Sequence, residues 1–138
     1  TVAAAEVKNL QGYSVFSNNN VPMLVVPKTA GSFSVDSVDL TGIAALELVA
    51  GGDKAPRSGY AFSLHLNSVN GPKIGEGVLP GGLKTKPTAQ GYFLTTVDLP
   101  VKPVTDGRFK NLYIVSKPLA PNQEGTLVVQ AVRFKPAK

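Results

Sequence analysis

Catalytic side chains are scarce in this sequence. It holds one histidine, His65, and no cysteine. A serine nucleophile would need His65 as its base, yet no Gly-x-Ser-x-Gly turn accompanies it. His65 also falls on the polar side of an alternating segment, where a histidine is usually a surface residue. We therefore expect no catalysis through His65.

Two acidic residues raise the question of glycoside hydrolysis, which commonly uses paired carboxylates. Asp36 and Asp39 are close in sequence, but on a regular strand residues at this spacing point to opposite faces. A bulge between them would change that, so the exclusion depends on a regular strand. We expect both to be solvated acids at strand edges.

The sequence also contains no motif for phosphate binding or for metal coordination. The glycine-rich stretch 71–77 lacks the Gly-Lys-Ser/Thr ending of a phosphate loop and leads into no helical pattern. No motif of histidine and carboxylate suits a metal. The absence of catalytic parts favours binding or architecture, and we expect no enzyme.

Length and composition suit one folded domain over residues 1–138. Of the 138 residues, 43% are hydrophobic and 17% charged, which is enough apolar material for a core. The absence of cysteine excludes disulfides and thiolate metal sites. No apolar run approaches the roughly 20 residues of a membrane helix, so we expect no membrane insertion.

The formal net charge of +5 is unevenly distributed. Residues 71–138 hold ten Lys/Arg and four Asp/Glu, whereas residues 1–70 hold four and five. Such a basic half could attract nucleic acid, anionic lipid or an acidic polysaccharide. The basic residues are spread singly, however, and no aromatics alternate with them as in a single-strand binding platform. We expect ordinary surface lysines and no nucleic-acid partner, with a slight preference for acidic glycans.

Strand patterns dominate the chain. Residues 60–66 alternate, with Tyr60, Phe62, Leu64 and Leu66 on one face. Residues 92–99 alternate as well, and 112–115 and 127–134 are rich in β-branched and aromatic residues. The apolar phase shifts by one position within 32–40, which predicts a bulge or a bend between sheets.

Turn residues separate these runs. Asn70-Gly71 predicts a hairpin between 60–66 and 73–78. Residues 44–50 contain good helix formers but are short and flanked by strand patterns, so we interpret them as a strand. Nine or ten short strands with frequent turns predict a sandwich or a barrel.

The strand and turn at 59–75 carry a family resemblance. Leu66, Asn67, Gly71, Ile74 and Gly75 fit the pattern R-L-(D/N)-x-x-x-G-x-x-I-G of family 6 carbohydrate-binding modules, with His65 in place of the arginine. The segment Val-Asp-Leu-Thr-Gly at 38–42 resembles a strand end of related modules. From about Glu6 onward, most of the chain resembles this family.

The resemblance implies an all-β fold, a jelly-roll β-sandwich of two antiparallel sheets. It also implies a sugar-binding cleft among loops at one end, where aromatic rings stack on the apolar face of a pyranose. Tyr92 stands at a tryptophan position of that cleft, although a tyrosine in a strand can equally be a packing residue. The second aromatic position falls near Val25 or Val26, and an asparagine position falls near Val128. We expect the carbohydrate-binding residues to be Tyr92, Asn122, Gln123, Asn18, Asn19 and Asn20.

Family 6 modules often carry a structural calcium ion between their first and last strands. The resemblance places Glu6 at one ligand position. Ala4 stands where another carboxylate is common, and Gln130 where an aspartate is usual. Because calcium prefers several carboxylates, we expect no required cofactor and leave calcium as an alternative at Glu6 and Gln130.

The expected function is non-catalytic binding of a polysaccharide, which would hold an appended catalytic or redox domain near its substrate. The variant at 38–42 resembles modules appended to bacterial sugar dehydrogenases, c-type cytochromes and other secreted proteins, so we expect a secreted or periplasmic protein. The alternative is a structural or docking sandwich that has lost sugar binding, because the Val25/Val26 and Val128 positions lack their usual groups.

Overall fold

A computed structural model describes residues 2–3, 6–18, 21–52, 59–80, 93–105, 107–119 and 127–136. Its elements are strands: β1 (Val2–Ala3), β2 (Lys8–Gln11), β3 (Ser14–Asn18), β4 (Val21–Val25), β5 (Gly31–Asp39), β6 (Ile43–Gly52), β7 (Gly59–Leu66), β8 (Lys73–Pro80), β9 (Phe93–Pro100), β10 (Phe109–Pro118) and β11 (Leu127–Pro136). In this part of the chain, no helix has the length and apolarity needed to cross a membrane.

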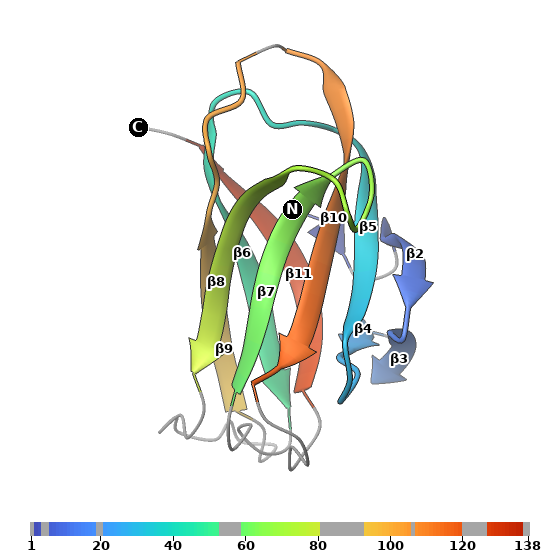
Figure 1. Ribbon diagram of the computed structural model, residues 1–138. Coiled ribbons are helices and arrows are strands. Elements are labelled where there is room, and N and C mark those ends of the chain that lie inside the picture. Colours follow the sequence, from blue (N-terminus) through green and yellow to red (C-terminus); the bar gives the residue numbers. More distant parts are fainter. Residues whose placement is uncertain are drawn as a thin grey trace.

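The strands form two antiparallel sheets packed face to face (Figure 1). One sheet has the order β3-β4-β11-β6-β9, and the short β1 also pairs with β11. The other has the order β2-β5-β10-β7-β8. Most neighbours in each sheet are distant in sequence. The predicted jelly-roll β-sandwich is confirmed, as are the strand at 44–50 and the strand pair around Asn70-Gly71.

The core lies between the sheets and follows the period-2 alternation of the sequence. Tyr60, Phe62 and Leu64 of β7 are almost fully buried, as predicted from their shared face. Leu46 and Leu48 of β6 face them from the other sheet. Buried hydrophobic residues from both sheets pack into one cluster. The outer face of each sheet is therefore left for polar side chains and recognition.

The predicted bulge in β5 is present. Strand β10 pairs Lys110 with Val38 but Leu112 with Val35, so two β5 residues oppose one β10 residue. Ser37 takes a left-handed φ of 56° there, and its backbone N–H donates to Asn111 Oδ1 (3.1 Å). The nearby carboxylates are engaged separately. Asp36 Oδ1 accepts a hydrogen bond from the Ser34 hydroxyl (3.0 Å), and Asp39 Oδ1 accepts one from the Thr41 N–H (2.9 Å).

One buried polar pair joins the chain before β3 to strand β10. The Tyr13 hydroxyl and the Ser116 hydroxyl are 2.6 Å apart, and both residues are buried. The Tyr13 ring meets Phe33 edge-on at a centroid distance of 5.0 Å. Burial raises the pKa of the Tyr13 phenol far above 10.0, an effect that the Ser116 hydrogen bond only partly opposes.

The raised pKa of Tyr13 predicts a loss of stability in alkali. Its stabilising contribution is complete below the unfolded pKa near 10.0 and is lost as the pH rises toward the folded value. Unfolding free energy should fall by about 1.4 kcal/mol per pH unit above pH ~10. Denaturant melts of wild type and Tyr13→Phe between pH 8 and 11.5 measure this.

The Tyr13→Phe variant should be about 1–2 kcal/mol less stable at pH 7, because Ser116 loses its buried partner. It should also show a flatter alkaline decline. Some pH dependence should remain, since burial raises the pKa of Tyr60 as well. An alkaline slope equal to that of wild type would contradict the assignment to Tyr13.

Candidate functional site

One end of the sandwich, here called the loop end, is where three segments pass from one sheet to the other. Gly52 pairs with both Leu127 and Phe93 in the first sheet. In the second sheet Gly59 pairs with Pro80, and Pro118 pairs with Tyr60. These strand ends flank segments 53–58, 81–92 and 120–126. The predicted residues Tyr92, Asn122 and Gln123 belong to these segments and lie outside the described residues, so their role stays a prediction.

The two family positions that are valines here meet at the loop end. Val25 of β4 pairs with Val128 of β11, and the Val26 N–H donates to the Leu127 carbonyl oxygen (2.9 Å). Neither valine supplies a stacking ring or a side-chain amide. A sugar site at the loop end would therefore depend on other residues.

The Asn18–Asn20 prediction concerns the β3–β4 hairpin. Ser14 pairs with Val25 at one end of this hairpin, and Asn18 pairs with Val21 at the other. Val25 lies at the loop end and pairs with Ser14. Asn18 is four residues beyond Ser14, so it lies about 13 Å from the loop end, at about 3.3 Å per residue. Asn19 and Asn20 lie outside the described residues, so a shared site with Asn122 stays a prediction.

The suggested calcium ligands belong to neighbouring segments. Ala3 of β1 pairs with Ala131, the residue after Gln130, and Glu6 follows three positions later in the chain. Glu6 is exposed and Gln130 half-buried. The described residues contain no group of three or more His, Cys, Asp or Glu side chains suited to a metal. One carboxylate and one amide fit calcium poorly, because this ion prefers several charged oxygen ligands.

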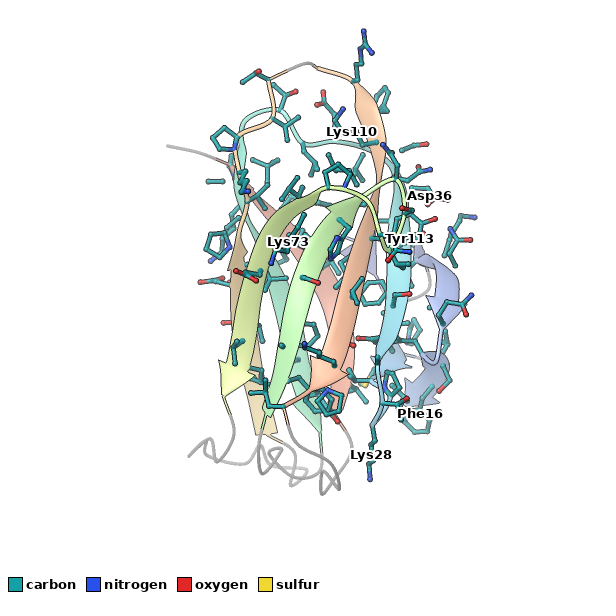
Figure 2. All side chains as sticks on the ribbon, in the orientation of Figure 1. Phe16, Lys28, Asp36, Lys73, Lys110 and Tyr113 are labelled. Carbon is teal, nitrogen blue, oxygen red and sulfur yellow. The ribbon has the colours of Figure 1, made fainter. Side chains whose placement is uncertain are left out.

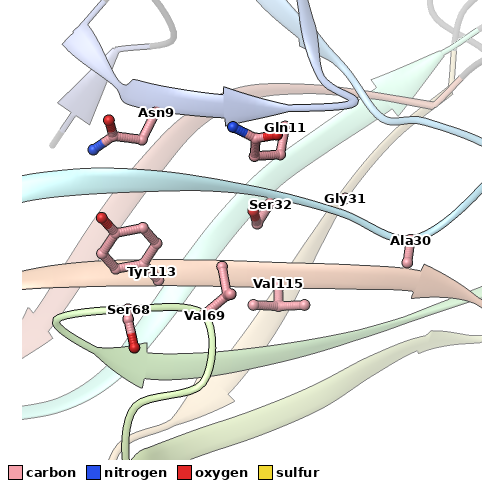
Figure 3. Close-up of a pocket in the computed structure, with 9 residues that line it drawn as sticks. All are labelled: Asn9, Gln11, Ala30, Gly31, Ser32, Ser68, Val69, Tyr113 and Val115. Atoms are coloured by element: carbon pink, nitrogen blue, oxygen red, sulfur yellow. The ribbon is translucent and has the colours of Figure 1, made fainter.

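A groove of about 630 Å³ lies on the outer face of the second sheet (Figure 3). This volume falls within the range of sites that hold small ligands. Its residues come from β2, β5 and β10 and from the two connections that precede β5 and β8: Asn9, Gln11, Ala30, Gly31, Ser32, Ser68, Val69, Tyr113 and Val115. We take this groove as the candidate functional site.

Tyr113 and Val115 form the apolar floor of the groove. In β10 the residues Leu112, Ile114 and Ser116 are buried in the core, so the alternating Tyr113 and Val115 face outward. Tyr113 pairs with Ser34 on one side and with His65 on the other. Figures 2 and 3 show its ring lying on the outer face of the sheet.

Strand β2 forms one wall. Asn9 takes a left-handed φ of 54°, and its side-chain amide donates to the Ser34 hydroxyl (2.8 Å). Ser34 donates in turn to Asp36, and the Lys8 carbonyl oxygen lies 3.3 Å from its hydroxyl. This chain of hydrogen bonds fixes β2 against β5 and so fixes the wall.

The turn 67–72 between β7 and β8 forms the opposite wall. The Asn67 N–H donates to the Asn111 carbonyl oxygen (2.7 Å), which anchors the turn to β10. His65 Nδ1 lies 3.0 Å from the Gly71 carbonyl oxygen, and Nε2 lies 2.9 Å from the Ser63 hydroxyl. A carbonyl only accepts, so Nδ1 carries a proton. His65 thus supports the wall that Ser68 and Val69 present.

Several polar groups in the groove remain available to a ligand. Within the described part of the chain, the Gln11 amide, the Ser68 hydroxyl and the Tyr113 hydroxyl make no hydrogen bond to protein. An aromatic ring and a valine on the floor, with polar groups at the walls, suit a flat molecule that has apolar faces and polar edges. No lining residue is charged.

Tyr113 was not among the site residues predicted from the sequence, although 112–115 was predicted as a strand. Alternation with the apolar Leu112 and Ile114 is the signal that could have indicated an outward Tyr113. The walls on either side could not be predicted, because β2 and the 67–72 turn are far from β10 in sequence.

Comparisons with known proteins identify solved structures that share this architecture. No protein-family profile matches the sequence, and no curated protein matches it. Among solved structures, a family 6 carbohydrate-binding module from Clostridium cellulolyticum, in complex with xylose, superimposes with a TM-score of 0.75. Identity is 16%, covering 97% of this chain and 95% of that one. The chain shares the fold of family 6 carbohydrate-binding modules.

Two further modules agree. One from Clostridium stercorarium, in complex with cellobiose, gives a TM-score of 0.71 at 13% identity, over 99% of this chain and 92% of that one. A β-1,3-glucan binding module from Bacillus halodurans gives 0.69 at 14% identity, over 97% and 93%. At such low identity, the likeness establishes the fold.

Proposed function

We propose that this protein is a non-catalytic carbohydrate-binding module that recognises polysaccharide through the groove on the β2-β5-β10 face. The observation that carries the proposal is the outward Tyr113 ring between two walls that hydrogen bonds hold in place. A pyranose stacks its C–H face on such a ring while its hydroxyls reach polar atoms at the edges. Gln11 and Ser68 are the matching polar groups. The solved modules of the same fold, titled as complexes with cellobiose and xylose, support this choice of ligand class.

A non-enzymatic role fits the state of the reactive groups. Both ring nitrogens of His65 are within hydrogen-bonding distance of partners in its own hairpin. Asp36 is engaged by Ser34, and the groove itself is lined by uncharged residues. Hydrolysis of glycosides needs two carboxyl groups facing one bond, and the groove lining supplies none.

The test is a binding screen of the purified protein by affinity gel electrophoresis and isothermal titration calorimetry. The panel holds xylan, cellulose-derived, β-1,3-glucan and uronate-containing polysaccharides. We expect retardation by at least one glycan and no release of reducing sugar from any of them. Absence of binding to the whole panel at millimolar oligosaccharide would refute the proposal.

The same proposal includes an appended partner domain and a secreted or periplasmic location. A glycoside hydrolase family 43 arabinoxylan arabinofuranohydrolase from Bacillus subtilis superimposes over 88% of this chain but only 22% of its own length, with a TM-score of 0.64. A sandwich of this fold thus occurs within a longer enzyme. By holding a catalytic or redox domain at its polysaccharide, the module would raise the local substrate concentration.

A docking role is the alternative, and one observation favours it. Val15 and Phe16 are 50% and 52% exposed on β3, the outermost strand of its sheet. Apolar residues on an open strand edge suit contact with another protein domain. If the glycan screen is negative, this edge is the surface to test.

Calcium should contribute little to stability. The two suggested ligands, Glu6 and Gln130, offer one carboxylate between them, and a weakly bound ion stabilises only slightly at millimolar concentration. We expect Tm in 5 mM EDTA and in 5 mM CaCl2 to agree within about 2 °C. Differential scanning calorimetry measures it, with MgCl2 as the ionic-strength control. A calcium-specific rise above about 5 °C would establish the ion as structural.

A further inference from the structure

We propose that the groove is built for an acidic polysaccharide, with one sugar ring on Tyr113 and a carboxylate or sulfate group at Lys117 and Lys28. This inference rests on the proposed function and narrows its ligand class. It follows from the ion pairs on the outer face of the first sheet, and from two lysines beside the groove that form no ion pair with any other described residue.

On the outer face of the first sheet the charges neutralise one another. Glu47 accepts from Arg133 (3.4 Å) and from Lys135 (2.9 Å). Lys135 also reaches Asp98 (3.1 Å). Two cations thus pair with two anions. None of these four residues leaves a positive charge free for an anionic ligand.

The outer face of the second sheet also carries an ion pair, between Lys73 and Glu76 of β8 (3.0 Å), but two lysines beside the groove take no part in it. Lys117 follows Tyr113 and Val115 at two-residue spacing on β10, so it projects from the same outer face. Lys117 and Lys28 are exposed, and neither forms an ion pair with any other described residue. Within the described part of the chain, no carboxylate neutralises either of these charges.

Both lysines lie at the end of the groove nearest the loop end. Ser116 pairs with Gly31, so the next residue along β10, Lys117, comes beside Ala30 at the groove's end. Lys28 precedes Ala30 by two residues, and Figure 2 shows it at the lower end of the β5–β10 face. Asp36 lies toward the opposite end, beyond the Ser34–Tyr113 pair. Lys8, which pairs with Ser34, also lies toward that end, so the feature that distinguishes the groove is the pair Lys117 and Lys28 at its other end.

The two lysines favour one ligand chemistry. Their ammonium groups can donate hydrogen bonds to the hydroxyls of a neutral glycan, but an anionic group beyond the ring on Tyr113 would also gain the attraction of both charges. Lysine acts as a point charge without the planar geometry that fits a carboxylate, so carboxylate and sulfate are equivalent to it. A chain of uronate or sulfated sugars supplies ring faces and regularly spaced anions together.

The test compares matched acidic and neutral probes by isothermal titration calorimetry. The acidic probes are oligosaccharides of alginate, polygalacturonate and carrageenan, and the neutral probes are oligosaccharides of xylan and cellulose. We expect an acidic probe to bind about ten-fold more tightly in 50 mM NaCl, with the advantage shrinking in 500 mM NaCl. Preference for carboxylate or for sulfate supports the proposal in either case and names the anion.

Lysine variants test which positive charges bind the acidic probe. The double variant Lys28→Gln/Lys117→Gln should lose about five-fold in affinity for the acidic probe and change little for neutral ones. The matched control is Lys102→Gln. Lys102 is exposed beside β8, two strands from β10, where its N–H donates to the Ile74 carbonyl oxygen, and its replacement should cost less than about two-fold. Equal loss in Lys102→Gln and in Lys117→Gln alone would reveal general attraction to a basic protein and overturn the inference.

Failure of this inference and failure of the proposed function give different results. Neutral glycans that bind as tightly as acidic ones, with loss in Tyr113→Ala but not in the lysine variants, overturn the acidic ligand and leave the function standing. Absence of binding by every probe overturns both.

Discussion

Replacement of Tyr113 by alanine is expected to weaken glycan binding about ten-fold or more. The ring is the largest apolar surface of the groove floor, and stacking adds about 0.5–1.5 kcal/mol beyond the area buried. Together these losses exceed the 1.4 kcal/mol that corresponds to ten-fold in affinity. Titration calorimetry with the best glycan of the screen measures the change.

The control for Tyr113→Ala is Tyr113→Phe, which keeps the ring and removes only the hydroxyl. It should retain affinity within about three-fold, the cost of one neutral hydrogen bond. Thermal melts of both variants should match wild type closely, because Tyr113 lies outside the core. Unchanged binding by a folded Tyr113→Ala variant would remove the groove as the site.

Tyr92→Ala separates the groove from the loop-end site that the family resemblance implies. If Tyr92→Ala abolishes binding while Tyr113→Ala does not, recognition occurs at the loop end. Loss in both variants would indicate two sites on one chain, and double-variant titrations would then show whether their contributions add.

Replacement of Gly75 by alanine is expected to cause a large loss of stability. Gly75 lies on β8, where the second sheet meets β9 of the first, and it forms a bridge with Val101. A Cβ atom there would lie 2.4 Å from the Pro100 carbonyl oxygen and 3.1 Å from Leu64 Cδ1. The closest obstacle is backbone, so the strands must separate, at a cost of about 2–3 kcal/mol.

For a chain of this size such a loss lowers Tm by about 5–10 °C. Differential scanning calorimetry measures it. Val78→Ala on the same strand is the control, since Val78 is 53% exposed and its truncation should cost less than about 0.5 kcal/mol. If Gly75→Ala melts with wild type, the two strands do not approach as closely as described.

The strands and their faces could be predicted from the sequence because alternation is a local property. Tyr60, Phe62 and Leu64 share a face in any strand, and the shift of phase within 32–40 indicated a bulge or a bend, of which the structure has the bulge, at Ser37. The conformation of the 67–72 turn was harder to predict from the sequence. Asn70-Gly71 suggested a tight hairpin, but the longer turn is held by two hydrogen bonds between Asn67 and Asn111 of β10, a strand distant in sequence.

By itself, then, the sequence determined an all-β chain of nine or ten short strands, the face shared by Tyr60, Phe62 and Leu64, and the scarcity of catalytic groups. The choice of a sandwich over a barrel came from the family resemblance. Only the tertiary structure decided where a ligand can lie, because Asn9, Ser32, Ser68 and Tyr113 form one groove only once their strands pair. The same holds for charge. The count of lysines and arginines predicts a basic protein. In the folded chain, Arg133 and Lys135 pair with Glu47 across strands, whereas Lys117 lies beside the groove. Local periodicity sets which way a side chain points, and long-range strand order sets what it meets.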